Sequence, residues 1–286
     1  MTSVPHSLFK YFSSKRLDVL RNLTVRYTPL GAFNDPFEGR PEILALASPE
    51  RMEEIIREVR PQIIREAYAK QLPRHVQADL SYAQFEQQVL KQIDGNPSAS
   101  SAIFAPYVAP LRELMSRTFD KSLGAFCLSE VPDSLLMWSH YGDSHAGFAI
   151  EFDAQHQYFD QRRSEVDEFR HLRQVEYRQA RPSANFSDLS AVDVFCVKSE
   201  HWSYEREWRI FRALGDADIT TAGEPYPNHL YHFPAGALRS VILGARATQE
   251  TIESVQEILS GNRELGHVRL RRASVDGSQF LLRIED

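Results

Sequence analysis

Charged and aromatic side chains are concentrated in the segment KSEHWSYEREWRIF, which begins at Lys198. If EREWRIF forms a strand, Glu205 and Glu207 lie on one face, about 7 Å apart, because alternate side chains share a face. In a site without water, the negative charge of one such carboxylate raises the pKa of the other. This pattern indicates a carboxylate that binds ribose hydroxyls or stabilises a developing cation. The alternative is a salt-bridge ladder of Glu205, Glu207 and Arg209 at a sheet edge.

A second group of polar aromatic side chains lies in MWSHYGDSHAGFAIEFD, where Trp138, His140 and Tyr141 follow one another closely. Their rings are apolar and their edges are polar, so they suit the wall of a binding pocket. A packed aromatic corner is the alternative. His140, Asp143 and His145 lack the spacing of known zinc motifs, so we expect no metal site there.

The loop FNDPFE contains the third group of candidate residues. Asn34 and Asp35 favour a turn in which a side chain bonds to the backbone two residues later, and this turn presents Asp35 or Glu38 inward. Turn formation does not explain the two flanking phenylalanines, so we expect this loop to contribute to a site.

Alternation of apolar and polar residues predicts more strands than helices. The expected strands cover residues 7–12, 23–28, 123–130, 147–153, 172–178, 205–213, 230–234, 239–245, 267–275 and 280–285. Helices are not regularly placed between them, which favours an α+β fold with a mixed, mostly antiparallel sheet over a doubly wound parallel fold. We expect one domain over residues 1–286.

Helical spacing dominates residues 48 to about 120, which we interpret as an α-helical insertion into the strand-rich part. Ser48 with Pro49 predicts one helix start, and Ser81 with Gln84 predicts another through a capping box. Pro61 is expected to kink or restart the first helix. Shorter helices are expected at residues 14–22 and 183–196, and a longer one is expected to be capped by Thr248.

The composition of the 286 residues is ordinary for a globular protein, with 42% hydrophobic and 25% charged residues. A formal net charge of −6 provides no global positive field that would attract nucleic acid or an anionic membrane. The two cysteines, Cys127 and Cys196, have apolar neighbours and are interpreted as reduced core thiols. No apolar stretch has the length of a signal peptide or a membrane span, so we expect a cytoplasmic protein without membrane contact.

The segments LFKY, VRYTPLGAFNDPFEG, FCLSE…LLMWSHYGDSHAGFAIEFD and KSEHWSYEREWRIF, in this order, resemble a bacterial domain-of-unknown-function family. The resemblance covers roughly residues 7–212, with the helical insertion between its parts.

The layout is also similar, more distantly, to that of ADP-ribosyltransferases, which break the nicotinamide–ribose bond of NAD in a cleft between two small antiparallel sheets. This resemblance implies that Glu207 is the catalytic carboxylate and Glu205 its partner. It also implies that Tyr11 contacts NAD from the first strand and that Tyr141 or Trp138 stacks on nicotinamide. The first strand has Lys10 and Tyr11 where these enzymes usually have arginine or histidine.

Three functions remain open from the sequence. The first is an NAD-using enzyme that releases nicotinamide, with a protein or nucleic acid as an unspecified acceptor. The second is a non-catalytic module that binds a nucleotide or a peptide. The third is a metal-dependent nuclease or hydrolase. The acidic residues available to the third are Asp35, Glu38, Glu151 and Glu207.

The expected ligand-binding residues are Tyr11, Asn34, Asp35, Trp138, His140, Tyr141 and Trp202, around a small nucleotide. The geometric condition for the NAD-using enzyme is that Glu207, Tyr11, Tyr141 and the Asn34–Asp35 loop line one cleft. The Glu207→Gln substitution is then expected to leave the melting temperature nearly unchanged.

Overall fold

The computed structural model describes residues 3–71, 80–94 and 99–285. Its strands are β1 Ser7–Phe12, β2 Thr24–Pro29, β3 Glu42–Ile43, β4 Leu123–Ser129, β5 Phe148–Asp153, β6 Arg173–Gln174, β7 Glu176–Arg178, β8 Ser183–Ala184, β9 Val197–Ser199, β10 Glu207–Ala213, β11 Ile219–Thr221, β12 Asn228–His232, β13 Leu238–Leu243, β14 Arg269–Val275 and β15 Leu282–Glu285. Its α-helices are α1 Asp18–Asn22, α2 Pro49–Gln71, α4 Tyr82–Asp94, α5 Ala99–Ser122, α6 Leu135–His140, α7 Ala191–Phe195 and α8 Gln249–Gly261. The segment Glu200–Glu205 is a 3-10 helix, η5.

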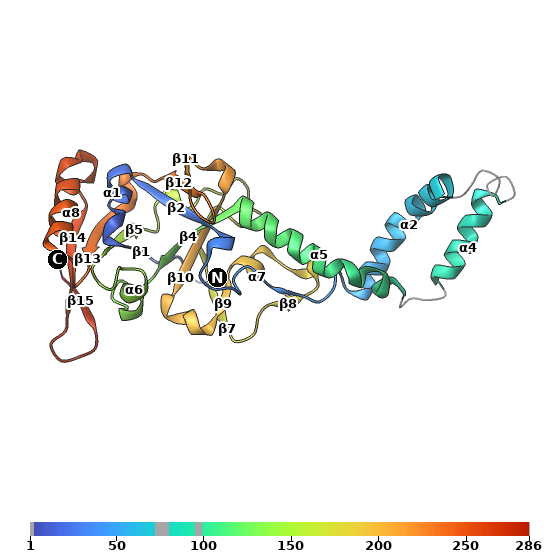
Figure 1. Ribbon diagram of the computed structural model, residues 1–286, viewed down its shortest axis with the longest axis horizontal. Helices are drawn as coiled ribbons and strands as arrows, with labels where there is room; N and C mark the ends of the chain where they lie inside the picture. Colours follow the sequence, from blue (N-terminus) through green and yellow to red (C-terminus); the bar gives the residue numbers. More distant parts are fainter. Residues whose placement is uncertain (1–2, 72–79, 95–98, 286) are drawn as a thin grey trace. The chain divides into compact units, whose positions relative to one another are not determined.

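Within the described residues, eleven of these strands form one sheet (Figure 1). Its order is β11-β12-β2-β4-β1-β5-β13-β14-β15, with β10 and then β6 added beside β4. Neighbouring strands are antiparallel except for β13 and β14, which are parallel. The predicted α+β class with a mixed, mostly antiparallel sheet is therefore confirmed.

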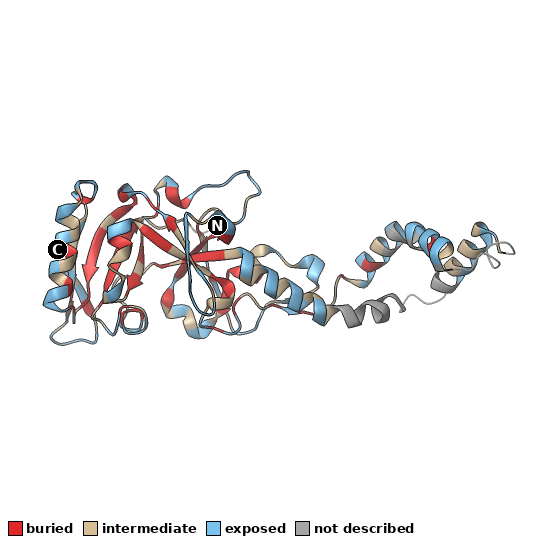
Figure 2. Ribbon diagram, turned by 45° about the horizontal axis from the view of Figure 1, so that its top comes forward, coloured by how far each residue is buried: buried red, intermediate tan, exposed pale blue. Residues whose placement is uncertain are grey.

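The two faces of this sheet carry separate apolar clusters, as alternation along the strands requires. On one face the larger cluster packs against α1 and α8, and it includes Leu8 of β1 and Val255 of α8. On the other face a smaller cluster includes Phe9 and Tyr11 of β1 with Trp138 of α6. Figure 2 shows that the buried residues follow the strands. Strand β1 therefore contributes side chains to two different environments.

The sheet has a gap beside β4, and this gap positions the site. Strand β10 pairs with β4 along its whole length, from Leu123 to Ser129. On the opposite edge, β2 pairs with β4 at Gly124 and Ala125, and β1 pairs with it at Ser129. The described strands leave residues 126–128 of β4 without a partner on that edge. Strands β1 and β2 therefore diverge there, which leaves room between them.

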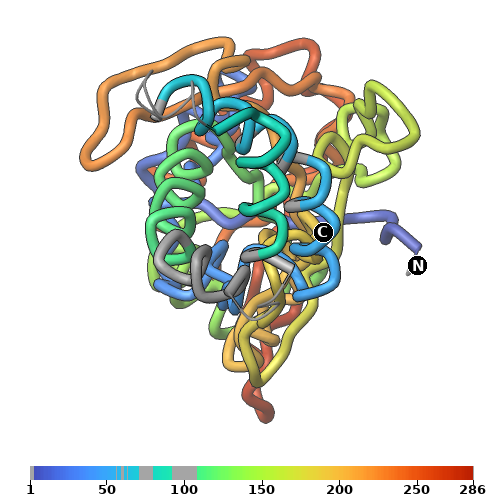
Figure 3. Tube along the Cα trace, turned by 90° about the vertical axis from the view of Figure 1, so that its right-hand side faces the viewer, coloured from blue at the N-terminus to red at the C-terminus, as the bar shows by residue number. Residues whose placement is uncertain are grey.

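The described chain forms two compact units, of which residues 3–40, 116–181 and 191–285 make the first and contain the large sheet. The second consists of residues 41–115 and 182–190. In the second unit α2 and α4 lie side by side (Figures 1 and 3), where the Tyr68 ring contacts Tyr82 and Phe85.

The predicted helix starts in the second unit are present. The Ser48 hydroxyl accepts from the amide of Arg51, and Ser81 and Gln84 form the reciprocal capping box. Helix α2 runs through Pro61 without a break, so of the two expectations, a kink or a restart, the restart does not occur. No helix in the described ranges has the length and apolarity needed to cross a bilayer.

Candidate functional site

The gap beside β4 opens into a cavity with a volume of about 310 Å³, and all of its walls belong to the first unit. Its lining residues are Phe9, Lys10, Tyr11, Thr28, Ala32, Phe33, Asn34, Glu38, Cys127, Leu128, Ser129, Met137, Tyr141, Lys198, Glu205, Glu207 and Arg209. They come from β1, β2 and the loop after it, β4, α6, β9, η5 and β10. Segments that are far apart in the sequence therefore converge on one cavity.

The two glutamates of the segment EREWRIF reach this cavity by a different route from the one predicted. Helix η5 ends at Glu205, β10 begins at Glu207, and Arg206 between them has a left-handed backbone with φ of 42°. The prediction that both glutamates lie on one strand is therefore wrong, because the strand starts two residues later. The hydroxyl of Tyr177 accepts from the Glu207 amide at 2.8 Å and fixes this start.

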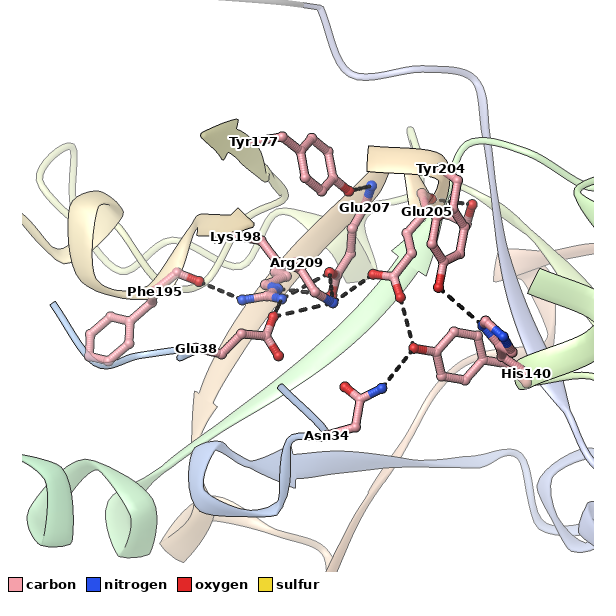
Figure 4. A network of polar contacts seen from close by, with 12 residues as sticks. Asn34, Glu38, His140, Tyr177, Phe195, Lys198, Tyr204, Glu205, Glu207 and Arg209 are labelled. Carbon is pink, nitrogen blue, oxygen red and sulfur yellow. Dashed lines mark hydrogen bonds and ion pairs between the residues drawn. The ribbon is translucent and has the colours of Figure 1, made fainter. Parts of the chain in front are cut away.

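Three buried carboxylates surround the ammonium group of Lys198 (Figure 4). The Nζ atom lies 2.6 Å from Glu205, 3.2 Å from Glu207 and 3.3 Å from Glu38. Arg209 binds Glu207 in a bidentate manner, with both N–O distances at 2.8 Å, and also bonds to Glu38. Three acids thus face two cations, which leaves one net negative charge when all three acids are ionised.

These neighbours move the pKa values of the two glutamates in opposite directions. Burial would raise the pKa of Glu207, but Arg209 and Lys198 outweigh it and hold that pKa well below its ordinary value. Burial and the charge of Glu207 raise the pKa of Glu205. Burial lowers the pKa of Lys198, yet Glu207 and Glu38 bring it above its usual value. Two carboxyl groups with separated pKa values are a common arrangement for acid–base chemistry.

A chain of hydrogen bonds extends from Glu205 along the cavity wall. The Tyr141 hydroxyl donates to Glu205 at 2.7 Å and accepts from the Asn34 amide at 3.2 Å. Tyr11 lies on the same wall, where its hydroxyl donates to the carbonyl of Val131 and burial raises its pKa. Glu207, Tyr11, Tyr141 and Asn34 therefore line one cavity, whereas Asp35 of the same loop does not line it.

Four other predicted residues lie outside the lining. Trp138 is fully buried behind the cavity wall, where its ring meets Tyr11 edge to face and its indole donates to Pro132. Asp35 is buried and forms the predicted turn by accepting from the amide of Phe37. His140 is exposed and bonds to Tyr204. Trp202 is half-buried, with the Lys198 ammonium 4.8 Å from its ring centre.

Sequence reasoning did not identify Lys198 or Lys10 as site residues. The signal in the sequence was the position of Lys198, seven and nine residues before Glu205 and Glu207, because a buried lysine requires carboxylate partners. Lys10 lines the cavity on β1, and none of the ion pairs found among the described residues involves it. Cys127 also lines the cavity, and burial raises the pKa of its thiol, which keeps it protonated.

The arrangement of acids also bears on a metal site. The Lys198 ammonium already occupies the position among Glu38, Glu205 and Glu207 that a cation would take. Glu151 accepts instead from the hydroxyls of Ser7 and Ser240 and does not line the cavity. In the part of the chain that the structure describes, no three His, Cys, Asp or Glu side chains are placed to hold a metal.

Comparison with known proteins matches part of the chain to a family that has no assigned activity, and no curated protein or solved structure matches the chain. This agrees with the resemblance to a domain-of-unknown-function family. The matched segment begins within α6 and contains Lys198, Glu205 and Glu207 of the cavity. The family model that matches residues 137–210 is described as Protein of unknown function (DUF2971).

Proposed function

We propose that the cavity binds NAD and breaks its nicotinamide–ribose bond, transferring the ADP-ribosyl group to water or to an acceptor. The observation that carries the proposal is that Glu205 and Glu207 meet Tyr11, Asn34 and Tyr141 in one cavity. The hypothesis of an NAD-using enzyme required Glu207, Tyr11, Tyr141 and the Asn34–Asp35 loop to share a cleft.

The charge of the site suits this reaction. Nicotinamide in NAD is a pyridinium, so it leaves as a neutral base and takes the electron pair of the C–N bond without needing a proton. Positive charge then develops on the ribose, and the carboxylates of Glu205 and Glu207, which line the cavity, stabilise it. Removing one preorganised group of this kind costs roughly 10²–10³ in rate in other enzymes.

The second half of the reaction needs a base for the incoming nucleophile. Glu205 has a raised pKa and hydrogen-bonds to Tyr141, so it can accept the proton that water or an acceptor hydroxyl loses on attacking the ribose. Lys10 lies in the same cavity without an ion-pair partner in the described residues, and it can pair with a phosphate of the ligand.

The experiment is to incubate the purified protein with NAD and measure released nicotinamide by chromatography. We expect release by the wild-type protein and a fall of at least about a hundredfold for Glu205→Gln. Lys15→Gln, at an exposed position outside the cavity lining, is the matched control and should retain full activity. Absence of nicotinamide release from the wild type, with and without protein and nucleic-acid acceptors, would refute the proposal.

One observation favours a second function, a non-catalytic nucleotide-binding module. Both oxygens of Glu207 already accept from Arg209, and one of them also contacts Lys198, as expected of a structural ion pair. In that case NAD or a related nucleotide binds with a measurable dissociation constant, but no nicotinamide is released.

A further inference from the structure

The outer surface of η5 carries aromatic rings that the proposed reaction does not use. Trp202 and Tyr204 have ring centres 6.1 Å apart, Tyr204 and His140 are 6.0 Å apart, and His140 and Tyr141 are 6.2 Å apart. Tyr141 lines the cavity, so this row of rings leads from the cavity wall to the surface. None of the four rings is fully buried.

Trp202 has an unusual position in this row. One face of its indole covers the Lys198 ammonium at 4.8 Å, while the residue remains partly exposed. The other two tryptophans are buried and use their indole N–H groups internally, since Trp138 donates to Pro132 and Trp208 donates to Glu130. A large apolar ring left partly in solvent beside a cavity commonly contacts a ligand.

The size of the cavity indicates which ligand group this surface would contact. A volume of about 310 Å³ is at the lower end for sites that enclose a small ligand. It can enclose one nucleoside half of a dinucleotide and leaves the other half outside. Bases that lie outside a pocket bind by stacking on aromatic side chains, which accept any base because every base has a π face.

We infer that the Trp202–Tyr204 surface binds the second base of a dinucleotide whose first nucleoside occupies the cavity. The inference rests on the proposed function and specifies its substrate class: a dinucleotide is preferred to a mononucleotide with the same reacting half. The bond between His140 Nδ1 and the Tyr204 hydroxyl, at 3.1 Å, holds the two rings together next to Tyr141 of the cavity wall. Trp202 is therefore a specificity residue that does not touch the reacting atoms.

The test compares NAD with nicotinamide mononucleotide, which has the same nicotinamide ribose but lacks the second base. Trp202→Leu should raise the dissociation constant for NAD by about tenfold to a hundredfold. Calorimetry within minutes of mixing measures this constant. Binding of nicotinamide mononucleotide should change less than twofold. Trp202→Phe, which retains a stacking ring, should restore most of the affinity for NAD.

Wild-type fluorescence gives a second readout that needs no variant. Trp202 is the one tryptophan of the three that is partly exposed, so at saturation NAD should quench the emission more strongly than nicotinamide mononucleotide does. Equal weakening of both ligands by Trp202→Leu would overturn the inference and show that Trp202 acts through Lys198. Unchanged binding of both ligands, or no binding of NAD to the wild type, would also overturn it.

These results can be separated from those of the proposed reaction. NAD that binds through Trp202 without release of nicotinamide would refute the reaction and support the stacking surface. NAD that is cleaved by Trp202→Leu with an unchanged KM would refute the stacking surface alone.

Discussion

Replacing Arg209 with methionine tests whether the buried charges depend on one another. Arg209 is 1% exposed and donates to Glu207, to Glu38 and to the carbonyl of Phe195. Without it, Glu38, Glu205 and Glu207 would share the single ammonium of Lys198. Breaking a buried ion pair in this way typically costs about 3–5 kcal/mol, because the remaining charges are left uncompensated. At roughly 2–4 °C per kcal/mol, the melting temperature should fall by about 6–20 °C.

The control for this variant is Arg239→Met, which breaks another arginine–carboxylate pair of the same sheet. Arg239 lies 2.9 Å from Asp153, and the two side chains are 36% and 30% exposed. Such a pair is worth about 1 kcal/mol or less. Urea denaturation followed by circular dichroism gives both free energies of unfolding. If Arg209→Met costs no more than Arg239→Met, the cluster is not the coupled network described here.

The remaining predictions concern the acids of the cavity and their hydrogen bonds. Glu207→Gln should lower the free energy of unfolding by about 3–5 kcal/mol, since Arg209 and Lys198 lose a shared partner. This replaces the unchanged melting temperature that was expected from the sequence, and a fall in melting temperature of less than about 2 °C would contradict it. Combining Glu207→Gln with Arg209→Met should cost about 0.5–3 kcal/mol less than the sum of the single variants in a double-mutant cycle, whereas strict additivity would show that the two side chains do not interact. The pKa of Glu205 is raised in the folded protein, so the folded state binds more protons at this group than the unfolded chain does. Glu205 should therefore lower the free energy of unfolding as pH rises above about 4.5, and Glu205→Gln should flatten this part of a profile of urea midpoint against pH. An unaltered slope would contradict the raised pKa. Tyr141→Phe removes one hydrogen bond to Glu205 and should lower the free energy of unfolding by about 1 kcal/mol. The same variant should release nicotinamide at least tenfold more slowly, and full activity would exclude a role for this hydrogen bond.

Local patterns predicted much of the fold because they depend on short-range physics. Strand β1 covers the predicted residues 7–12, and its alternating side chains do divide between two apolar clusters. Thr248 caps α8 by accepting from the amide of Thr251, and β14 pairs with β15 in antiparallel register as predicted. Each of these features depends on residues that are close in the sequence.

Features that depend on tertiary contacts were not predicted. Residues 172–178 were expected to form one strand but form β6 and β7, separated at Val175, whose amide donates to the carbonyl of Glu207. Residues 183–196 were expected to be helical, but only α7 at Ala191–Phe195 is an α-helix, and β8 pairs with β3. Distant partners decided the conformation of both segments.

The site was predictable as a set of segments but not as a set of contacts. Glu205 and Glu207 were identified by their charges and spacing, although the left-handed turn at Arg206 that orients them has no signal in the residue type. The central position of Lys198 depends on Glu38, which is 160 residues away in the chain. Trp138 was expected at the cavity surface because its ring has a polar edge, but Pro132 satisfies that edge inside the protein.

A crystal structure of the Glu205→Gln variant with NAD would show whether the cavity beside β4 holds the nicotinamide ribose. We expect electron density for this ribose within hydrogen-bonding distance of Glu207 or residue 205, with the pyridinium ring near Tyr11 or Tyr141. Density for NAD at another place on the protein, with this cavity filled by solvent, would contradict it.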